Sequence, residues 1–274
     1  MSYKIVMDGA AEVNPRLMGK VISVPLTVSV NGKDYCTDDN MDIDAFRAEV
    51  RNSKEPPRSS CPSPDAFCDA IGECDRVYII AITAVLSGSY NSARLGLQMY
   101  LGENPGKKGH VFNSLNASGG EALVAEKIVE LEEKGMDFEE IVKAVEDYIP
   151  TITTNVVLED LSVLYKNGRL SKVAYVATSL IDLVAVLGIR NGELVKIAQA
   201  RGVKRALKTL AETSIADIKA KGVKKIIITH SAAPERAEAL KAALEAECEL
   251  DIVVVPTGGL ISMYAGEKGL VISY

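Results

Sequence analysis

Residues 76–100, RVYIIAITAVLSGSYNSARLGLQMY, decide the predicted fold. The first part, Arg76–Thr83, is a short run rich in Ile and Val, which is typical of a buried strand. The last part, Ala93–Tyr100, predicts a helix, and the polar loop Leu86–Ser92 joins the two. The free backbone N–H groups of a first helical turn, together with the helix dipole, favour a bound anion. The loop therefore predicts a pocket for a carboxylate or a phosphate.

The residue types in this loop predict binding and not catalysis. The hydroxyl groups of Ser87, Ser89 and Ser92 can donate hydrogen bonds to one acceptor, and the loop contains no strong base, metal ligand or thiol. The whole chain has five cysteines without a Cys-x-x-Cys pair, and two histidines. That spacing does not match a zinc site. We expect free thiols, no metal and no cofactor.

The composition narrows the class of protein. Hydrophobic residues make up 47% of the 274 residues and charged residues 25%, as in globular proteins. The net charge of −6 argues against a nucleic-acid partner, because phosphate binding needs clustered Lys and Arg. No segment approaches the roughly 20 apolar residues of a membrane span, and the N-terminus reads as a strand and not as a signal peptide. We expect a cytoplasmic protein.

Strands and helices alternate through the first part of the chain. Tyr3–Met7 predicts a strand that ends at Asp8, and Lys107–Ser114 predicts another that ends in polar residues. Val21–Val30 alternates apolar and polar residues, and Thr151–Leu158 is β-branched, so both also predict strands. The alternation indicates a parallel α/β sheet, whose ligands lie at the carboxyl ends of its strands.

The pattern changes in the last part of the chain. Asn191-Gly192 between two apolar runs predicts a hairpin, and Val203–Lys221 predicts an amphipathic helix. Further elements are predicted at Lys225–Thr229, Glu235–Glu247 and Glu249–Val255, with a final hairpin formed by Leu260–Tyr264 and Gly269–Ile272. Hairpins beside helices indicate a second domain with a mixed sheet.

The order of the motifs resembles that of the DegV family of bacterial fatty-acid-binding proteins, essentially from end to end. Leu86–Ala93 is similar to the family's Leu-Ser-Gly-Thr-Tyr-x-Ser-Ala loop, and Ser59–Ser63 is similar to Thr-Ser-Gln-Pro-Ser. Four shorter segments also match in order: Asp8-Gly9, Asn113-Ser114, Asn167–Ser171 and Arg201-Gly202.

The resemblance implies a two-domain α/β fold. Residues 1–163 would form an α/β/α domain with a parallel sheet and the serine-rich loops, and residues 164–274 a mixed-sheet domain. A long-chain fatty acid would lie in an apolar tunnel between the domains. The residues that would hold its carboxylate are Ser59, Ser60, Ser87, Gly88, Ser89 and Tyr264. In characterised relatives the bound acid is handed to a fatty acid kinase subunit, so the binding protein itself would not be an enzyme.

Two departures from the family pattern bear on this expectation. Tyr264 stands where the family often has the His of His-x-Gly-Pro-Gly, and Gly9 replaces the Ser of the first Asp-Ser. A phenol can still donate a hydrogen bond, but it carries no charge at neutral pH. The departures affect the expected kinase coupling more than lipid binding, because the apolar chain supplies most of the affinity.

Several residues remain open between a ligand role and a structural one. Asp8 is as well explained by a helix cap and Arg169 by an ion pair at the domain junction, and Ser114 is either a ligand or a structural residue. Ser59 and Ser87 also suit ordinary turns.

The main alternative function is a kinase- or phosphatase-like enzyme that binds a small phosphorylated metabolite at the Ser87 loop. Neither Gly-x-x-x-x-Gly-Lys-Ser/Thr nor Gly-x-Gly-x-x-Gly follows a strand, however, and Leu-Ser-Gly-Ser-Tyr is not the Gly-x-Ser-x-Gly of hydrolases. A third option is a regulatory module whose lipid occupancy controls a partner.

Overall fold

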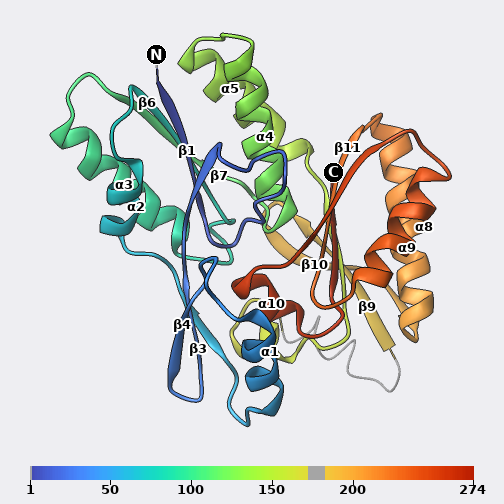
Figure 1. The fold of residues 1–274 in the computed structure, drawn as a ribbon. Helices are drawn as coiled ribbons and strands as arrows, with labels where there is room; N and C mark the ends of the chain where they lie inside the picture. The colour runs from blue at the N-terminus through green and yellow to red at the C-terminus, as the bar shows by residue number, and fades with distance from the viewer. Residues whose placement is uncertain (1, 172–182) are drawn as a thin grey trace.

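The first sheet is parallel and is covered by helices on both faces (Figure 1). The computed structural model describes residues 2–171 and 183–274. The strand order is β2-β1-β6-β7, with β1 at Tyr3–Asp8, β2 at Val21–Val24, β6 at Arg76–Ala81 and β7 at Lys108–Asn113. On one face lie α2 (Pro64–Ile71) and α3 (Ser89–Glu103), and on the other α4 (Gly119–Glu133) and α5 (Phe138–Tyr148). This is the predicted α/β/α arrangement.

Alternation along the strands builds the two cores of this sheet. Val6, Val77 and Ile79 pack with the apolar side chains of α2 and α3. Their neighbours Ile5 and Ile80 point the other way and pack with α4 and α5. Because both faces of the sheet are covered, the strands are apolar at nearly every position.

The second sheet is mixed and has six strands in the order β10-β9-β8-β13-β11-β12. Its strands are β8 (Thr154–Leu158), β9 (Leu183–Arg190), β10 (Glu193–Arg201), β11 (Lys225–His230), β12 (Asp251–Pro256) and β13 (Leu270–Ser273). Only β11 and β12 pair in parallel. One face packs against α8 (Val203–Lys221) and α9 (Pro234–Glu245). Helix α4 packs against both sheets and so joins the two halves of the molecule.

Strand β8 does not extend the parallel sheet, so that prediction is wrong. It pairs antiparallel with β13 and β9 in the second sheet. A buried β-branched run looks the same whichever sheet it enters, and only distant strands decide its partner. The expected domain boundary between residues 163 and 164 falls inside the short helix α6 (Ser162–Lys166), after β8. The 3-10 turn η1 (Ile149–Thr151) precedes β8.

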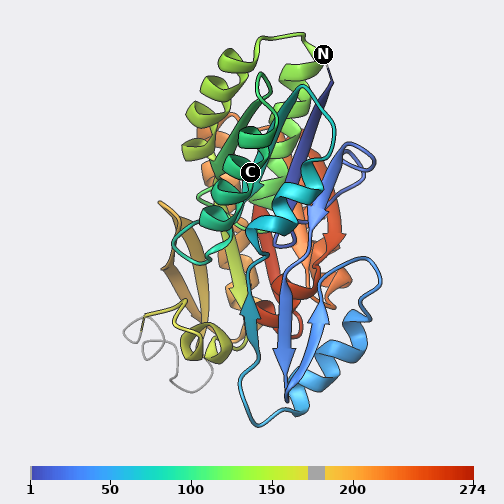
Figure 2. The same ribbon diagram turned by 90° about the vertical axis from the view of Figure 1, so that its left-hand side faces the viewer.

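The predicted strand Val21–Val30 is two strands. Pro25 separates β2 from β3 (Thr27–Val30), because proline cannot donate a ladder hydrogen bond. With β4 (Lys33–Cys36) and β5 (Arg58–Ser60), β3 forms a small antiparallel sheet beside α1 (Ile43–Asn52), seen at the bottom of Figures 1 and 2.

The final hairpin is not formed, because its expected first strand is helix α10 (Gly259–Ala265). The five residues Leu260–Tyr264 are too few to show a helical or strand period, so the sequence alone could not separate the two. The helix ends at Gly266, whose φ of 61° favours glycine.

The predicted hairpin of β9 and β10 is confirmed, and its tip contacts the segment that precedes the serine loop. Asn191 and Gly192 both have positive φ, as a two-residue hairpin turn requires. A Cβ atom on Gly192 would lie 2.3 Å from Thr83 Oγ1 and 3.4 Å from Val85 Cγ2. The turn of the second sheet is therefore seated directly on the segment that leads to Ser87.

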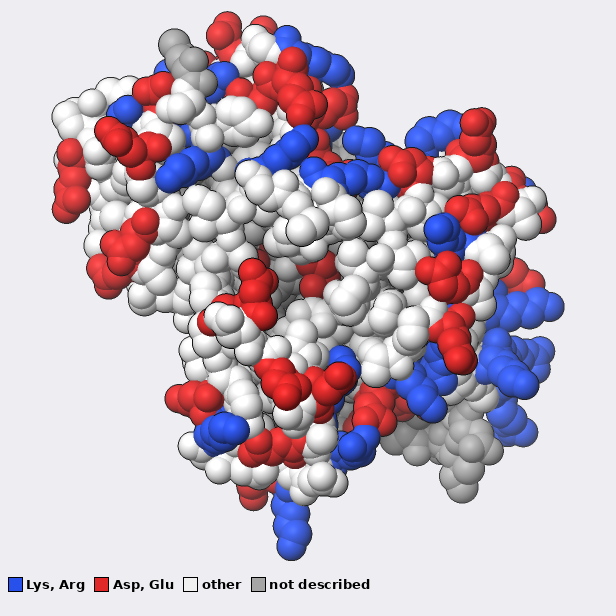
Figure 3. Space-filling model, in the orientation of Figure 1, with Lys and Arg blue, Asp and Glu red and all other residues white. Residues whose placement is uncertain are grey.

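Among the described residues, no helix is both long and apolar enough to cross a membrane. Acidic and basic side chains are mixed over most of the face shown in Figure 3.

Candidate functional site

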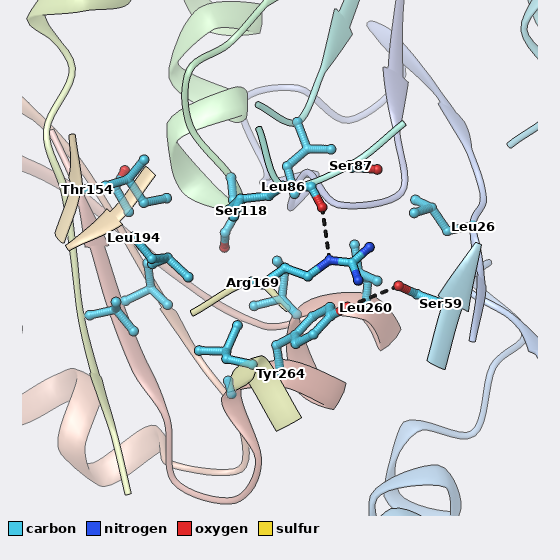
Figure 4. A pocket seen from close by; sticks show the side chains of 18 of the residues that line it. Leu26, Ser59, Leu86, Ser87, Ser118, Thr154, Arg169, Leu194, Leu260 and Tyr264 are labelled. Carbon is cyan, nitrogen blue, oxygen red and sulfur yellow. Dashed lines mark hydrogen bonds between the residues drawn. The ribbon is translucent and has the colours of Figure 1, made fainter. Parts of the chain in front are cut away.

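A cavity of about 310 Å³ lies between the second sheet, the loop that follows β6, strand β5 and helix α10 (Figure 4). This volume is at the lower end of the range of small-molecule sites. Most of the wall is apolar and comes from segments far apart in the sequence. The apolar lining residues are Leu26, Ile82, Leu86, Ala117, Val156, Leu158, Leu164, Ile189, Leu194, Leu260, Ile261, Ala265 and Val271.

One end of the cavity is polar. The Ser59 hydroxyl of β5 and the Tyr264 hydroxyl of α10 are hydrogen-bonded at 3.1 Å, and the Arg169 guanidinium lies beside them, between Ser59 and Leu86 (Figure 4). Ser87 lines the same end. Ser60, Cys61 and Gly88 also line the cavity and are exposed, so the polar end is in contact with solvent.

Arg169 brings a positive charge to this end. Its Nε donates to the carbonyl oxygen of Leu86 at 3.1 Å, and its Nη1 donates to the carbonyl oxygen of Asn167. In residues 2–171 and 183–274, no Asp or Glu forms an ion pair with it, so the ion pair weighed from the sequence is not formed there. Within the described ranges the partners of this half-buried guanidinium are neutral oxygens, so its charge can still attract an anion.

The structure of the serine loop explains why only one of its three hydroxyl groups reaches the cavity. Ser87 Oγ accepts from the backbone N–H of Ser89 at 3.2 Å and closes the turn before α3. Ser92 donates to the carbonyl oxygen of Pro62, towards α2. Ser89 is completely buried and faces Asp8. Successive positions on a helix point in different directions, so the predicted convergence of three hydroxyls does not occur.

Asp8 and Ser114 are also placed away from the cavity. Asp8 is fully buried and accepts from the N–H groups of Ala10 and Ile82, each at 3.1 Å. Ser114 is fully buried and donates to the carbonyl oxygen of Asn116 at 3.0 Å. Both residues stabilise turns at the carboxyl ends of strands. Neither lines the cavity.

Two further polar residues line the cavity that the sequence did not single out. Ser118 Oγ lies 2.9 Å from Thr229 Oγ1, and Thr154 Oγ1 lies 2.8 Å from Ser273 Oγ. Ser118 follows a strand and opens helix α4, as Ser87 precedes α3, so the same signal could have found it. Its φ of 56° is unusual for a residue with a side chain.

In the comparison with known proteins, one protein family matches nearly the whole chain. The model of the family described as "Uncharacterised protein, DegV family" matches residues 2–274. A DegV domain-containing protein of Streptococcus pneumoniae is 32% identical over 280 residues, covering 100% of this chain and 99% of that protein.

Solved structures agree with this result. A DegV family protein from Ruminococcus gnavus, crystallised with vaccenic acid, is 33% identical, has a TM-score of 0.93, and is covered at 100% in both chains. The fatty acid kinase B3 protein of S. pneumoniae, loaded with linoleic acid, is 32% identical with a TM-score of 0.90, at 100% coverage of this chain and 99% of that one. The match in sequence and in architecture shows that this chain belongs to the DegV family.

Proposed function

We propose that this protein binds one long-chain fatty acid. The acyl chain occupies the apolar cavity, and the carboxylate lies at its polar end, near Ser59, Ser87, Arg169 and Tyr264. The observation that carries the proposal is this division of one cavity into a mostly apolar wall and one polar end that carries a cation. A ligand with one anionic group and a long hydrocarbon tail matches that division.

The apolar wall accounts for most of the expected affinity. A fatty acid of about 16 carbons buries ~15 groups at ~0.8 kcal/mol each, or about 12 kcal/mol of gross transfer free energy. A neutral hydrogen bond adds only about 1 kcal/mol. The polar end therefore fixes the direction of the chain and selects an acid over a neutral lipid. The exchange of a family His for Tyr264 is compatible with this division of roles.

The relatives support the choice of ligand class. The R. gnavus and S. pneumoniae proteins hold vaccenic acid and linoleic acid, both unbranched long-chain acids. A phosphorylated metabolite, the alternative weighed from the sequence, would place its polar groups against the aliphatic part of the wall.

Protein purified from a heterologous host should carry endogenous fatty acid at close to one molecule per chain. The measurement is organic extraction followed by mass spectrometry, with an unrelated protein of similar size as the control. After delipidation, oleate or palmitate should raise the melting temperature, whereas nucleotides and sugar phosphates should not. An empty protein that also ignores added fatty acid would contradict the proposal.

We also propose that the bound acid is presented to a fatty acid kinase, as the name of the S. pneumoniae B3 protein suggests for that relative. The polar end is exposed at Ser60, Cys61 and Gly88, so a partner can reach the carboxylate without opening the apolar part. In this role the protein is a carrier and not the catalyst. ADP release by a fatty acid kinase should rise when lipid-loaded protein is added, and should stay at background with delipidated protein.

A further inference from the structure

Three acidic side chains are buried close to one another, and the first of them, Asp8, faces Ser89 of the serine loop. Asp8 ends β1, Glu12 follows it in the next loop, and Glu121 lies in the first turn of α4. Asp8 and Glu121 are 0% exposed and Glu12 is 6% exposed. None of the three lines the cavity or forms an ion pair with a base in the described part of the chain. Neither the carboxylate site nor the fold alone explains this cluster.

Asp8 has the surroundings of an ionised carboxylate. It accepts two backbone N–H groups, from Ala10 and Ile82, and the Ser89 hydroxyl lies beside it. Burial raises the pKa of Asp8, and these three groups, together with the Glu121 side chain, oppose that rise. Since Ile82 immediately precedes the segment 83–88, the Asp8 carboxylate fixes the start of the loop that carries Ser87.

Glu121 has the opposite surroundings. Its carboxyl oxygens form no hydrogen bond of normal geometry with the described residues, and the backbone N–H of Ser118 is the one donor that opposes the rise of its pKa there. The charged groups that act on it are both acids, Asp8 from β1 and Glu12 from the following loop. The other elements that pack on this end of α4 contribute uncharged side chains, such as Ile227 of β11 and Ser273 of β13. A buried carboxylate without a cation is strongly unfavourable, whereas a protonated carboxyl is neutral and can itself donate a hydrogen bond.

We propose that Glu121 keeps its proton in the folded protein and donates it in a hydrogen bond to Asp8, so that this shared proton positions the Ser87 loop. Burial raises the pKa of Glu121 well above its usual value, and the negative charge of Asp8 raises it further. Glu121 is thus a positioning residue that acts on the ligand site through Asp8. The protonation of Glu121 and its hydrogen bond to Asp8 do not depend on the proposed function. Only the effect of this hydrogen bond on a carboxylate bound at Ser87 rests on it.

Glu12 connects the cluster to the opposite side of the site. Its Oε2 accepts the backbone N–H of Gly258 at 2.8 Å, at the start of the helix that carries Tyr264. Its Oε1 is buried without a donor among the described residues, and burial raises the pKa of Glu12 to about 8. The cluster therefore contacts the backbone on both sides of the site: Asp8 binds Ile82, before the loop of Ser87, and Glu12 binds Gly258, before the helix of Tyr264.

The raised pKa values determine the sign of the pH dependence. The unfolded chain releases these protons near pH 4.5, and the folded protein holds that of Glu12 until about pH 8. The stability they contribute is fully present below pH 4.5 and is lost as the pH rises through about 8. If Glu12 or Glu121 also ionised, two or three negative charges would lie in one buried space. Their repulsion would loosen the loop that carries Ser87.

The first test is infrared spectroscopy of the delipidated protein, which does not depend on the ligand. At neutral pH, the difference spectrum between wild type and Glu121→Gln should contain the C=O stretching band of a protonated carboxyl. The same band should fade in wild type as the pH is raised, which needs no variant. Glu133→Gln, on the exposed part of the same helix, should leave the band unchanged. The band that remains in Glu121→Gln at neutral pH belongs to Glu12. No protonated-carboxyl band at neutral pH in wild type, or a band of equal intensity in wild type and in Glu121→Gln, would overturn the proposal.

The second test separates positioning from simple packing. A Gln side chain can still donate to Asp8, whereas Met fills a similar volume without a donor. Glu121→Met should weaken fatty acid binding about tenfold, and Glu121→Gln should bind like wild type. The melting temperature of wild type should fall between pH 5 and pH 9, and Glu121→Gln should reduce this fall. Equal weakening by both variants would show that Glu121 acts only by filling space.

Discussion

Val156→Phe should abolish lipid binding and leave the protein folded. Val156 lies in β8, is almost completely buried, and points into the cavity. A phenyl ring there occupies space that the acyl chain needs, and the cavity can accept the ring because this space is not filled by other side chains. We expect the acyl content after purification to fall at least tenfold, because most of the ~12 kcal/mol of gross transfer free energy depends on this space. Mass spectrometry measures the content, and thermal unfolding checks the fold.

Val157→Phe is the matched control, because the neighbouring residue of a strand faces the other side of the sheet. Val157 is 1% exposed and packs in the core beneath α8 with Val186 and Leu210. A larger side chain in that filled core should cost about 1–3 kcal/mol of unfolding free energy. The folded fraction should still carry lipid. If both variants retained lipid, or if Val157→Phe alone lost it, the acyl chain would not lie in this cavity.

Arg169→Met should weaken binding of a fatty acid by about 10- to 100-fold, and should change binding of the corresponding fatty alcohol little. A hydrogen bond to a charged group contributes roughly 1.5–3 kcal/mol, whereas the alcohol has no charge to pair with the guanidinium. Displacement of a fluorescent lipid by palmitate and by hexadecanol measures both affinities. The comparison matters because Arg169 also donates to the Leu86 carbonyl oxygen and so supports the loop.

Arg201→Met is the control for loss of a positive charge. Arg201 ends β10, is exposed, and does not line the cavity, so its loss should leave both affinities unchanged. If Arg169→Met weakened the acid and the alcohol equally, Arg169 would act by holding the loop and not by pairing with the carboxylate.

The sequence was sufficient for the elements whose signal is local. Apolar runs such as Arg76–Ala81 and the Asn191-Gly192 turn specify a buried strand and a hairpin by their own residues. The pairing of β8 with β13 and the helical state of α10 depend on segments more than 100 residues away along the chain. Neither the composition nor the hydrophobic period of a short segment contains information about such contacts. The order of the motifs along the chain indicated the family. The resemblance to that family then predicted the two-domain architecture, which the local sequence patterns alone did not determine.

The candidate site shows the same limit. Ser59 and Ser87 stand in short motifs, and the structure brings both to one end of the cavity. Ser89 stands in the same motif as Ser87 but is turned into the interior, because the first turn of α3 rotates it towards Asp8. The buried carboxyl cluster could not be found from the sequence, since Asp8 and Glu121 are acidic residues without any pattern that indicates burial.

The position of β13 has a consequence for how the protein is made. The last strand of the chain lies in the interior of the six-stranded sheet, between β8 and β11, and Val271 forms part of the cavity wall. While these residues are still inside the ribosome, the nascent chain has neither a closed second sheet nor a complete cavity. Loading with lipid therefore requires that β13 has been made and has paired, and a chain cut before residue 270 lacks part of the wall that holds the ligand.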